Sequence, residues 1–423
     1  MNCKNCKSKK LVKIFKLGNQ PISSVFPTKK IKKLKKYNLD LFKCSKCELV
    51  QFSKLAPLDD MYGETYGYRT SLSKLMINHM KSKYEGITKK YKLKKNSEIL
   101  DIGSNDGTFL NFFAKNKFNN LYAIDPSAKK FQKYYNNKIK NFFDYFSKKN
   151  IFNLNNRKKI TFSLITSYAM FYDIEDPNSF CADISDLLKK DGIWVLEMSY
   201  FPLLLKNLTY DQICHEHVTY YTLSTFKEII NKHNMDVIDF GFNDINGGSI
   251  EIICSKKNSI HKPKTKKIKE LLFEESKINN NSYMKFTDRV RNTKEVLNSF
   301  LSLIPKKDLI GYGASTKGNI VLNHCGIDNT KLNFICDANP YKFGRYTPGS
   351  NIKIISKIEM RKRNPKYLLV LIWSFRSEVI SQEVDYIKKG GKLVFHLPIF
   401  HIVDKHNYKK YLNKNFTSLS YEI

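Results

Sequence analysis

The chain has 423 residues, of which 42% are hydrophobic, so it is long enough for two or three domains that each bury a core. It has no apolar run of about 18 residues, and its start, MNCKNCKSKK, lacks the apolar segment of a signal peptide. These features argue against a membrane span and favour a cytoplasmic protein. The net charge of +34 comes from lysines scattered through almost every segment, a pattern of solvated faces more than of one nucleic-acid-binding element.

The first 71 residues contain two Cys-x-x-Cys pairs, Cys3 with Cys6 and Cys44 with Cys47. Four thiolates in this pattern are typical of a closed tetrahedral zinc site, so we expect a structural zinc in a domain over residues 1–71. Two disulfides are the alternative, and a reducing cytoplasm disfavours them. A Gly-punctuated turn with Tyr66 and Tyr68 ends this region. These tyrosines either cover the bound ligands or pack the small domain onto its neighbour.

A strand, tight turn and helix are predicted from the stretch ILDIGSNDGTFL at residues 99–110. Gly103 and Gly107 allow the backbone to turn sharply and approach a ligand. Asp125 ends the next predicted strand, where a carboxylate suits the two hydroxyls of a ribose. The stretch therefore predicts the first half of a nucleotide-binding βαβ unit.

The polarity of this loop indicates which nucleotide-like ligand it binds. Asp101, Asn105 and Asp106 place acidic and amide groups where a pyrophosphate would need bare N–H donors. A cationic ligand such as S-adenosylmethionine fits better, and the stretch resembles motif I of the class I methyltransferases. A nicotinamide cofactor remains the alternative. The predicted cofactor-binding residues are Asp101, Gly103, Ser104, Asn105, Gly107, Asp125, Pro126, Phe143 and Ser167.

Residues 72–255 read as a doubly wound α/β domain with a parallel core, because short buried strands alternate with helical patterns. Further strands are predicted at 121–124, 163–166 and 192–198, after a leading helix that begins near Ser71. Ligands in such sheets bind at the carboxyl ends of the strands. We therefore expect the loops that follow these strands to meet at one rim.

The segment Cys214-His215-Glu216-His217 lies downstream of that rim. It lacks the HExxH spacing of a zinc protease, so we prefer one histidine as a general base with Glu216 as its hydrogen-bond partner. A metal site, or histidines with only a packing role, are the alternatives.

A Lys-rich helical connector is predicted over 256–305, a second Rossmann-like domain over 306–405 and a tail over 406–423. The second domain begins with a strand and the loop GYGASTKG, which has no acid and therefore suits phosphate. A purely structural loop is the alternative. The predicted substrate-binding residues are Gly313, Ser315, Lys317, Gly318, Asp337, Lys342 and Arg376, together with Asp173 and Cys214.

In combination, the two cysteine pairs, the acidic loop, the Glu-His-x-x-Tyr-Tyr segment and GYGASTKG resemble the three-domain C-methyltransferases of nucleotide-linked deoxysugars. The resemblance implies a zinc-bearing N-terminal domain, a central S-adenosylmethionine domain and a C-terminal domain that helps to hold a nucleotide diphosphate sugar. It also implies methylation at a carbon beside a keto group. His217 would then be the base, Glu216 would position the sugar or the imidazole, and Tyr66 or Tyr68 would lie over the reacting centre.

Two positions depart from this family. Cys214 stands where the sugar-methylating members have a tyrosine, and Asp173 where they have a histidine. Another ketosugar, another carbon, or methylation of a hydroxyl therefore stay open. The rival classes are a nucleic-acid methyltransferase, a nicotinamide-dependent sugar oxidoreductase and a scaffold that only binds nucleotide sugars. The sequence leaves the oligomeric state open, a monomer included.

Overall fold

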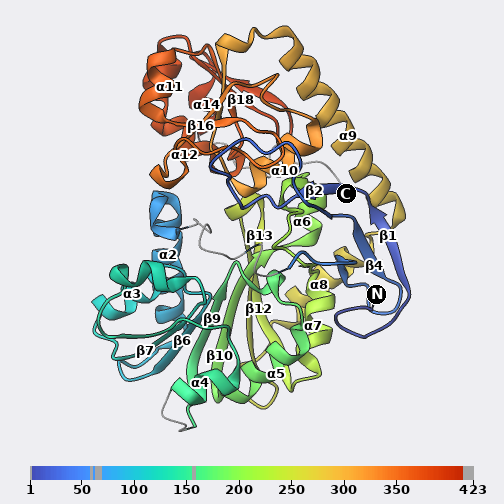
Figure 1. Ribbon diagram of the computed structural model, residues 1–423. Coiled ribbons are helices and arrows are strands. Elements are labelled where there is room, and N and C mark those ends of the chain that lie inside the picture. The colour runs from blue at the N-terminus through green and yellow to red at the C-terminus, as the bar shows by residue number, and fades with distance from the viewer. Residues whose placement is uncertain (1, 58–60, 62–68, 155–158, 413–423) are drawn as a thin grey trace.

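The computed structural model describes residues 2–57, 61, 69–154 and 159–412. Within them, two large sheets form the lower and upper bodies of the molecule, and the N-terminal region lies beside their junction (Figure 1). None of the helices in the described residues is both long enough and apolar enough to span a bilayer.

The N-terminal region does not close its own sheet. It supplies β1 (Leu11–Phe15), β4 (Leu41–Cys44) and β5 (Val50–Phe52), and the fourth strand is β11 (Thr219–Tyr220) from far along the chain. A separate hairpin is made by β2 (Asn19–Pro21) and β3 (Lys36–Asn38). β11 runs antiparallel to β5, with Tyr220 opposite Val50. The strand that completes the N-terminal sheet therefore begins two residues after His217.

The central region is built on a seven-stranded sheet in the order β12-β13-β10-β9-β6-β7-β8. Its strands are β6 (Glu98–Ile102), β7 (Asn120–Ile124), β8 (Ile139–Phe142), β9 (Phe162–Tyr168), β10 (Leu188–Ser199), β12 (Met235–Asn243) and β13 (Ser249–Lys256). β6 to β10 are parallel, whereas β13 runs antiparallel between β10 and β12. The predicted parallel core is confirmed.

Helices cover both faces of this sheet because its parallel strands are apolar on both sides. One face packs on α2 (Lys74–Tyr91) and α3 (Thr108–Lys115) through a core that includes Ile99 and Val195. The other packs on α5 (Pro177–Leu187), α7 (Leu223–Asn231) and α8 (Thr265–Ser276) through Leu100 and Leu196. A short helix, α4 (Lys148–Leu154), lies beside α5. The helix that was expected to begin near Ser71 begins at Lys74, after a turn of 3-10 helix over Thr70–Leu72.

The C-terminal region repeats the doubly wound plan with the order β16-β15-β14-β17-β18-β19. Its strands are β14 (Leu309–Tyr312), β15 (Phe334–Asp337), β16 (Lys353–Ser356), β17 (Tyr367–Val370), β18 (Lys392–Phe395) and the antiparallel β19 (His401–Val403). Its helices are α10 (Thr316–Cys325), α11 (Lys357–Arg363), α12 (Arg376–Gln382), α13 (Val384–Lys388) and α14 (Tyr408–Leu412). In both large sheets the strand order reverses beside the first strand, which is the position where open α/β sheets bind ligands.

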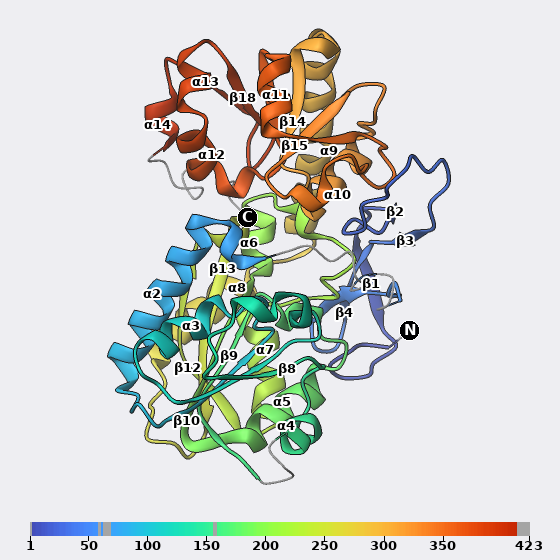
Figure 2. The ribbon, with the colours of Figure 1, turned by 60° about the vertical axis from the view of Figure 1, so that its left-hand side comes forward.

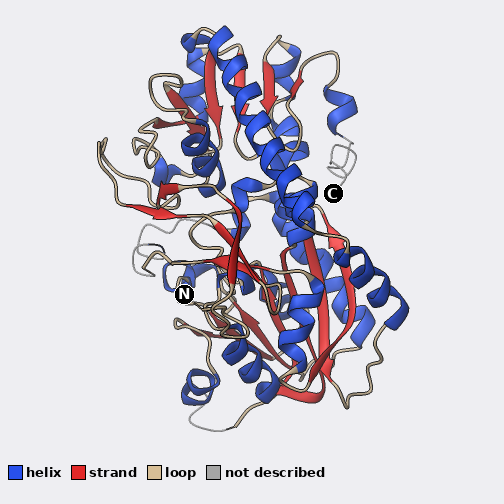
Figure 3. Ribbon diagram, turned by 90° about the vertical axis from the view of Figure 1, so that its right-hand side faces the viewer, coloured by secondary structure: helices blue, strands red, loops and turns tan. Residues whose placement is uncertain are grey.

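One long helix packs on all three regions. The long α9 (Asn280–Leu303) runs down one side of the molecule and packs on β1, on α10 and on α6 (Phe201–Lys206) (Figure 3). Its Phe286 ring lies edge-on to Phe15, with centroids 4.9 Å apart. The predicted connector is therefore a packing element of all three regions.

Candidate active site and zinc centre

The loop after β6 has the sharp turns that the glycine pattern predicts. Gly103 has φ +71° and Gly107 has φ +74°, in the left-handed region where glycine is favoured. A Cβ atom on Gly107 would lie 2.6 Å from the ring of Tyr135. That tyrosine donates its hydroxyl to the carbonyl oxygen of Asn105 at 2.8 Å and so holds the loop in place.

A cavity of about 400 Å³ opens at this loop, between the ends of β6, β7 and β9 and the start of α2. Cavities of this size suit cofactors. Six of the predicted cofactor residues line it: Asp101, Gly103, Ser104, Asn105, Asp125 and Pro126. Gly107, Phe143 and Ser167 are not among its lining residues; Ser167 is fully buried and its hydroxyl accepts a hydrogen bond from Trp194 Nε1 at 2.9 Å.

The cavity also has an apolar wall that sequence reasoning missed. Met76 and Met80 of α2, with Tyr168 and Met170 at the end of β9, line it beside the acidic residues. The helical spacing of the two methionines was visible in the sequence, but such spacing is equally typical of an ordinary core face. Asp173, predicted as a substrate residue, lines this same cavity.

The sequence suggests that all the polar side chains of this loop face the cavity, but not all of them do. Asp106 is not a lining residue; its carboxylate accepts hydrogen bonds from Ser71 N at 3.0 Å and Thr108 Oγ1 at 2.6 Å. Asn105 Oδ1 likewise accepts from Thr70 N at 3.0 Å. Asp106 therefore holds residues 69–71 and the start of α3 in place and, contrary to the inference from sequence, does not face the ligand cavity.

Of the acidic residues in the predicted cofactor set, Asp101 and Asp125 line the cavity. In Asp101, burial raises the pKa of the carboxyl group to about 7. The hydrogen bond that Thr166 Oγ1 donates to it acts in the opposite direction and lowers this pKa. Asp125 accepts hydrogen bonds from Asn105 N at 2.8 Å and from Ser127 Oγ at 2.7 Å. Oδ1 of Asp125 also accepts from Ser127 N at 2.6 Å, so within the described residues Oδ2 is the oxygen that keeps a second lone pair for a ligand hydroxyl.

The histidine segment lies at the junction of the three regions, just before β11. His215 is held by the N-terminal region: its Nε2 lies 3.2 Å from the carbonyl oxygen of Gln20, and its Nδ1 3.5 Å from Ser23 Oγ. Glu216 and His217 differ from it. Both are buried, and neither carboxylate oxygen of Glu216 nor Nδ1 of His217 has a hydrogen-bond partner within the described part of the chain.

The surroundings of His217 keep its imidazole neutral. Burial and the neighbouring Lys317 ammonium lower its pKa to about 3, and its ring packs on Tyr172 with centroids 4.1 Å apart. The pKa of the Cys214 thiol is raised well above its usual value by burial and by Glu216 and Asp173, so this cysteine is a neutral thiol. Cys214, Asp173 and Lys317 therefore share one electrostatic environment with Glu216 and His217.

Lys317 reaches this junction from the first turn of α10. Its ammonium donates to Asn246 Oδ1 at 3.1 Å, and burial lowers its pKa although Asp211 opposes the shift. Asp211 accepts a hydrogen bond from Trp373 Nε1 at 2.7 Å, which joins the central and C-terminal sheets.

The other residues of the phosphate-type loop mostly support the loop itself. Ser315 caps α10 by accepting from Gly318 N at 2.9 Å, and Gly313 has φ +89°. Asp337 accepts from Ala314 N at 2.8 Å, and Lys342 donates to the carbonyl oxygen of Ala314 at 2.7 Å. Arg376 is buried near the ring of Tyr411. Tyr66 and Tyr68 lie outside the described residues.

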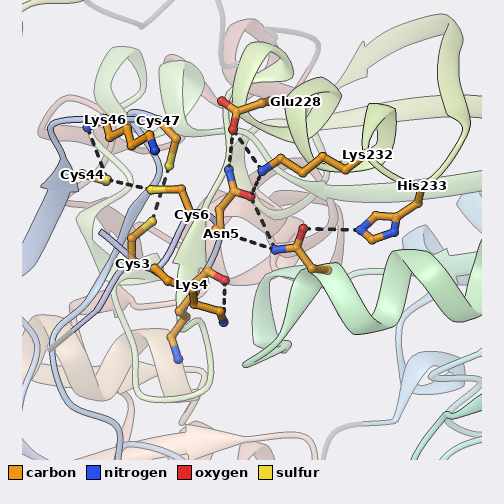
Figure 4. A network of polar contacts seen from close by, with 12 residues as sticks. Cys3, Lys4, Asn5, Cys6, Cys44, Lys46, Cys47, Glu228, Lys232 and His233 are labelled. Carbon is orange, nitrogen blue, oxygen red and sulfur yellow. Dashed lines mark hydrogen bonds and ion pairs between the residues drawn. The ribbon is translucent and has the colours of Figure 1, made fainter. Parts of the chain in front are cut away.

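The four N-terminal cysteines come together as predicted. Their Sγ atoms all lie within 4.8 Å of one another, with Cys3 and Cys47 at 3.4 Å and Cys6 and Cys44 at 3.6 Å (Figure 4). A tetrahedral zinc with bonds of about 2.3 Å requires sulfur separations of about 3.8 Å, so the set fits zinc. The thiols are free cysteines, which rules out the disulfide alternative in this structure.

The two halves of the cysteine cluster share one backbone geometry. Lys7 N donates to the carbonyl oxygen of Cys3 at 3.0 Å, and Glu48 N to that of Cys44 at 2.9 Å. Lys7 and Glu48 both have positive φ. Asn5, inside the first turn, donates to Glu228 Oε1 at 3.0 Å and so ties the cluster to α7 (Figure 4).

Comparisons with known proteins agree with this arrangement. Residues 3–62 match a family of zinc-binding domains, residues 76–239 a methyltransferase domain, and residues 244–398 the C-methyltransferase C-terminal domain. The C-methyltransferase NovU of Streptomyces niveus is 26% identical over 369 residues, which are 86% of each chain.

Solved structures of methyltransferases resemble part of the chain. Magnesium protoporphyrin IX methyltransferase from Synechocystis PCC 6803, with bound S-adenosylhomocysteine, is 11% identical with a TM-score of 0.33, over 43% of this chain and 83% of its own. An S-adenosylmethionine-dependent methyltransferase from Clostridium acetobutylicum is 14% identical with a TM-score of 0.32, over 42% of this chain and 91% of its own.

The cavity, the cysteine cluster and the three successive family matches define an S-adenosylmethionine-dependent methyltransferase with a zinc-binding N-terminal region. Within that class, the chain is similar to the C-methyltransferase NovU over most of its length, and its C-terminal region matches the C-methyltransferase C-terminal domain.

Proposed function

We propose that this enzyme methylates a nucleotide-diphosphate-linked ketosugar at the carbon beside its keto group, in the cytoplasm. The observation that carries the proposal is the pair Glu216 and His217. Within the described residues, neither carboxylate oxygen of Glu216 nor Nδ1 of His217 has a protein partner, so a ligand is needed to complete their hydrogen bonds. They adjoin Asp173, which lines the cofactor cavity.

The proposed chemistry is proton removal followed by carbon–carbon bond formation. His217 takes the proton from the carbon beside the keto group, and the electron pair of that C–H bond delocalises into an enolate. S-adenosylmethionine supplies an electrophilic methyl group. As the enolate carbon bonds to that methyl, the carbon–sulfur bond breaks and its electrons stay on sulfur, while the proton remains on His217 until solvent takes it. Glu216 holds a sugar hydroxyl or the imidazole in position.

The nucleotide diphosphate is assigned to the C-terminal region. Lys317 and the N-terminal end of the α10 dipole supply positive potential beside His217. The domain limits 1–71, 72–255, 256–305 and 306–405 belong to this proposal, with the sugar between the last two α/β regions. A nucleic-acid acceptor is disfavoured by the scattered lysines.

Methylation of a sugar hydroxyl is the second candidate, favoured by one observation. Cys214 is a buried neutral thiol where the family has a tyrosine, so one hydroxyl donor for an enolate oxygen is missing. The same imidazole could then take a proton from a hydroxyl group.

Isothermal titration tests the acceptor class. The protein is titrated with S-adenosylhomocysteine and then with UDP, dTDP and GDP at physiological salt. We expect micromolar binding of S-adenosylhomocysteine and selective binding of one diphosphate. Lys317→Ala should lower the affinity for that diphosphate about 10- to 100-fold, which corresponds to the loss of one hydrogen bond to a charged group. Lys331→Ala, an exposed lysine bonded to Asn298, is the matched control. Binding of S-adenosylhomocysteine alone would contradict a nucleotide sugar acceptor.

A further inference from the structure

The N-terminal region reaches past its cysteine cluster into the junction that holds Glu216 and His217. Residues 20–24 lie at the end of β2 and just after it. They contact the histidine segment of the central region and α10 of the C-terminal region. The Gln20 carbonyl oxygen contacts His215 Nε2 at 3.2 Å, and the Ser23 carbonyl oxygen accepts from Asn319 Nδ2 at 2.7 Å. Figures 1 and 2 both show β2 beside α10. One short segment thus lies between the histidine segment and the C-terminal region.

This segment carries buried polar side-chain atoms that the described part of the chain leaves without a partner. They are both amide atoms of Gln20 and the hydroxyl of Ser24, whose side chains belong to residues only 3% and 5% exposed. Asn319, 1% exposed, has an unpartnered Oδ1 although its Nδ2 is bonded to Ser23. Burying such groups without hydrogen bonds costs roughly 1–3 kcal/mol each. The segment that carries them contacts both Asn319 and His215, the residue before the unpartnered Glu216, and this set of unpartnered groups points to a ligand that completes them.

The chemistry of these groups selects the ligand. A primary amide offers donors and an acceptor, a hydroxyl offers both, and Asn319 Oδ1 and Glu216 offer acceptors only. None of the four is a cation, and the carboxylate would repel a phosphate. Neutral hydroxyl groups, each of which donates and accepts, match this set.

We propose that Gln20, Ser24 and Asn319 bind hydroxyl groups of the acceptor sugar, so that the zinc-bearing region helps to determine which sugar is methylated. The inference rests on the proposed nucleotide sugar acceptor. It gives the N-terminal region a part in recognition beyond folding around zinc. The diphosphate stays with Lys317, so the sugar and the diphosphate are read by different side chains.

The test compares each nucleotide sugar with its bare diphosphate. Wild-type protein is titrated with UDP and UDP-glucose, dTDP and dTDP-glucose, and GDP and GDP-mannose. The same titrations are made with Gln20→Met, which keeps the side chain's volume without its polar atoms, and with Ser24→Ala. Asn19→Ala, an exposed neighbour in the same strand, is the matched control. Zinc content, Tm and S-adenosylhomocysteine affinity report on folding.

We expect the Gln20 and Ser24 variants to bind the sugar nucleotide about 3- to 10-fold more weakly each, as loss of a neutral hydrogen bond predicts. Their affinity for the bare diphosphate, their zinc content and their Tm should match wild type, because no protein hydrogen bond is lost. Unchanged sugar-nucleotide affinity would mean that water alone fills these positions and would overturn the inference. A fall in Tm with equal weakening of both ligands would also overturn it. If wild-type protein binds no diphosphate or sugar nucleotide, the proposed function itself fails.

Discussion

Replacing His217 by asparagine tests the proposed general base. Nδ1 of His217 has no partner in the described residues, so the asparagine variant loses only the hydrogen bond between the imidazole and the Gln212 backbone, and the Tm should fall by no more than a few degrees. Loss of a general base lowers turnover about 10²- to 10⁴-fold, and a 10²-fold loss corresponds to about 2.7 kcal/mol. S-adenosylhomocysteine affinity should stay at the wild-type value, because His217 does not line the cofactor cavity.

The pH profile adds a second readout. Burial and Lys317 lower the pKa of His217 to about 3, so the imidazole is neutral and able to accept a proton at every pH above about 5. For wild-type enzyme, kcat/KM should therefore not fall with this group's protonation between pH 8 and pH 5. The assay follows methyl transfer from isotopically labelled S-adenosylmethionine, with His233→Asn, a partly exposed histidine near Asn178, as control. Near-normal turnover of His217→Asn would refute the assignment.

Two further predictions concern the cysteine cluster and a buried histidine. Wild-type protein should contain one zinc per chain. Cys44→Ser should lose the zinc and lower the Tm by more than about 5 °C, whereas Cys336→Ala, which changes a core cysteine outside the cluster, should keep its zinc. Equal zinc content in both variants would contradict the site. His396 is fully buried, and burial lowers its pKa from 6.5 to about 3, so only the unfolded chain binds its proton between those values and stability falls as pH falls through this window. Between pH 6.5 and pH 5, the free energy of unfolding measured with urea should therefore fall by about 2 kcal/mol less for His396→Phe than for wild type. The same pH dependence of the unfolding free energy in both proteins would rule this out.

Features with a short sequence signature could be predicted from sequence. The loop after β6 needs left-handed backbone at Gly103 and Gly107, which few residues other than glycine provide, so its glycines mark it. The cysteine cluster was predictable because thiolates paired at this spacing have few other uses. The doubly wound α/β plan of the two large sheets was predictable because predicted strands and helices alternate along the chain.

Features that depend on contacts between distant segments could not be predicted. Asp106 looked like a ligand group because its partner Ser71, 35 residues earlier, is identified only once the chain is folded. Gln20 has no motif of its own, and its burial beside His215 follows from pairing of β5 with β11 and packing of β2 on α10. The spacing of residues along the sequence does not indicate such tertiary contacts.

Transfer of a ¹³C-labelled methyl group tests the central claim most directly. The enzyme is incubated in D₂O with labelled S-adenosylmethionine and nucleotide-linked ketodeoxysugars carrying the diphosphate that binds in titration, and the product is examined by NMR. The account predicts a methyl group bonded to the carbon beside the keto group. It also predicts that without S-adenosylmethionine the hydrogen on that carbon exchanges for deuterium in wild type and not in His217→Asn. A methyl group on oxygen, or no transfer although both ligands bind, would contradict it.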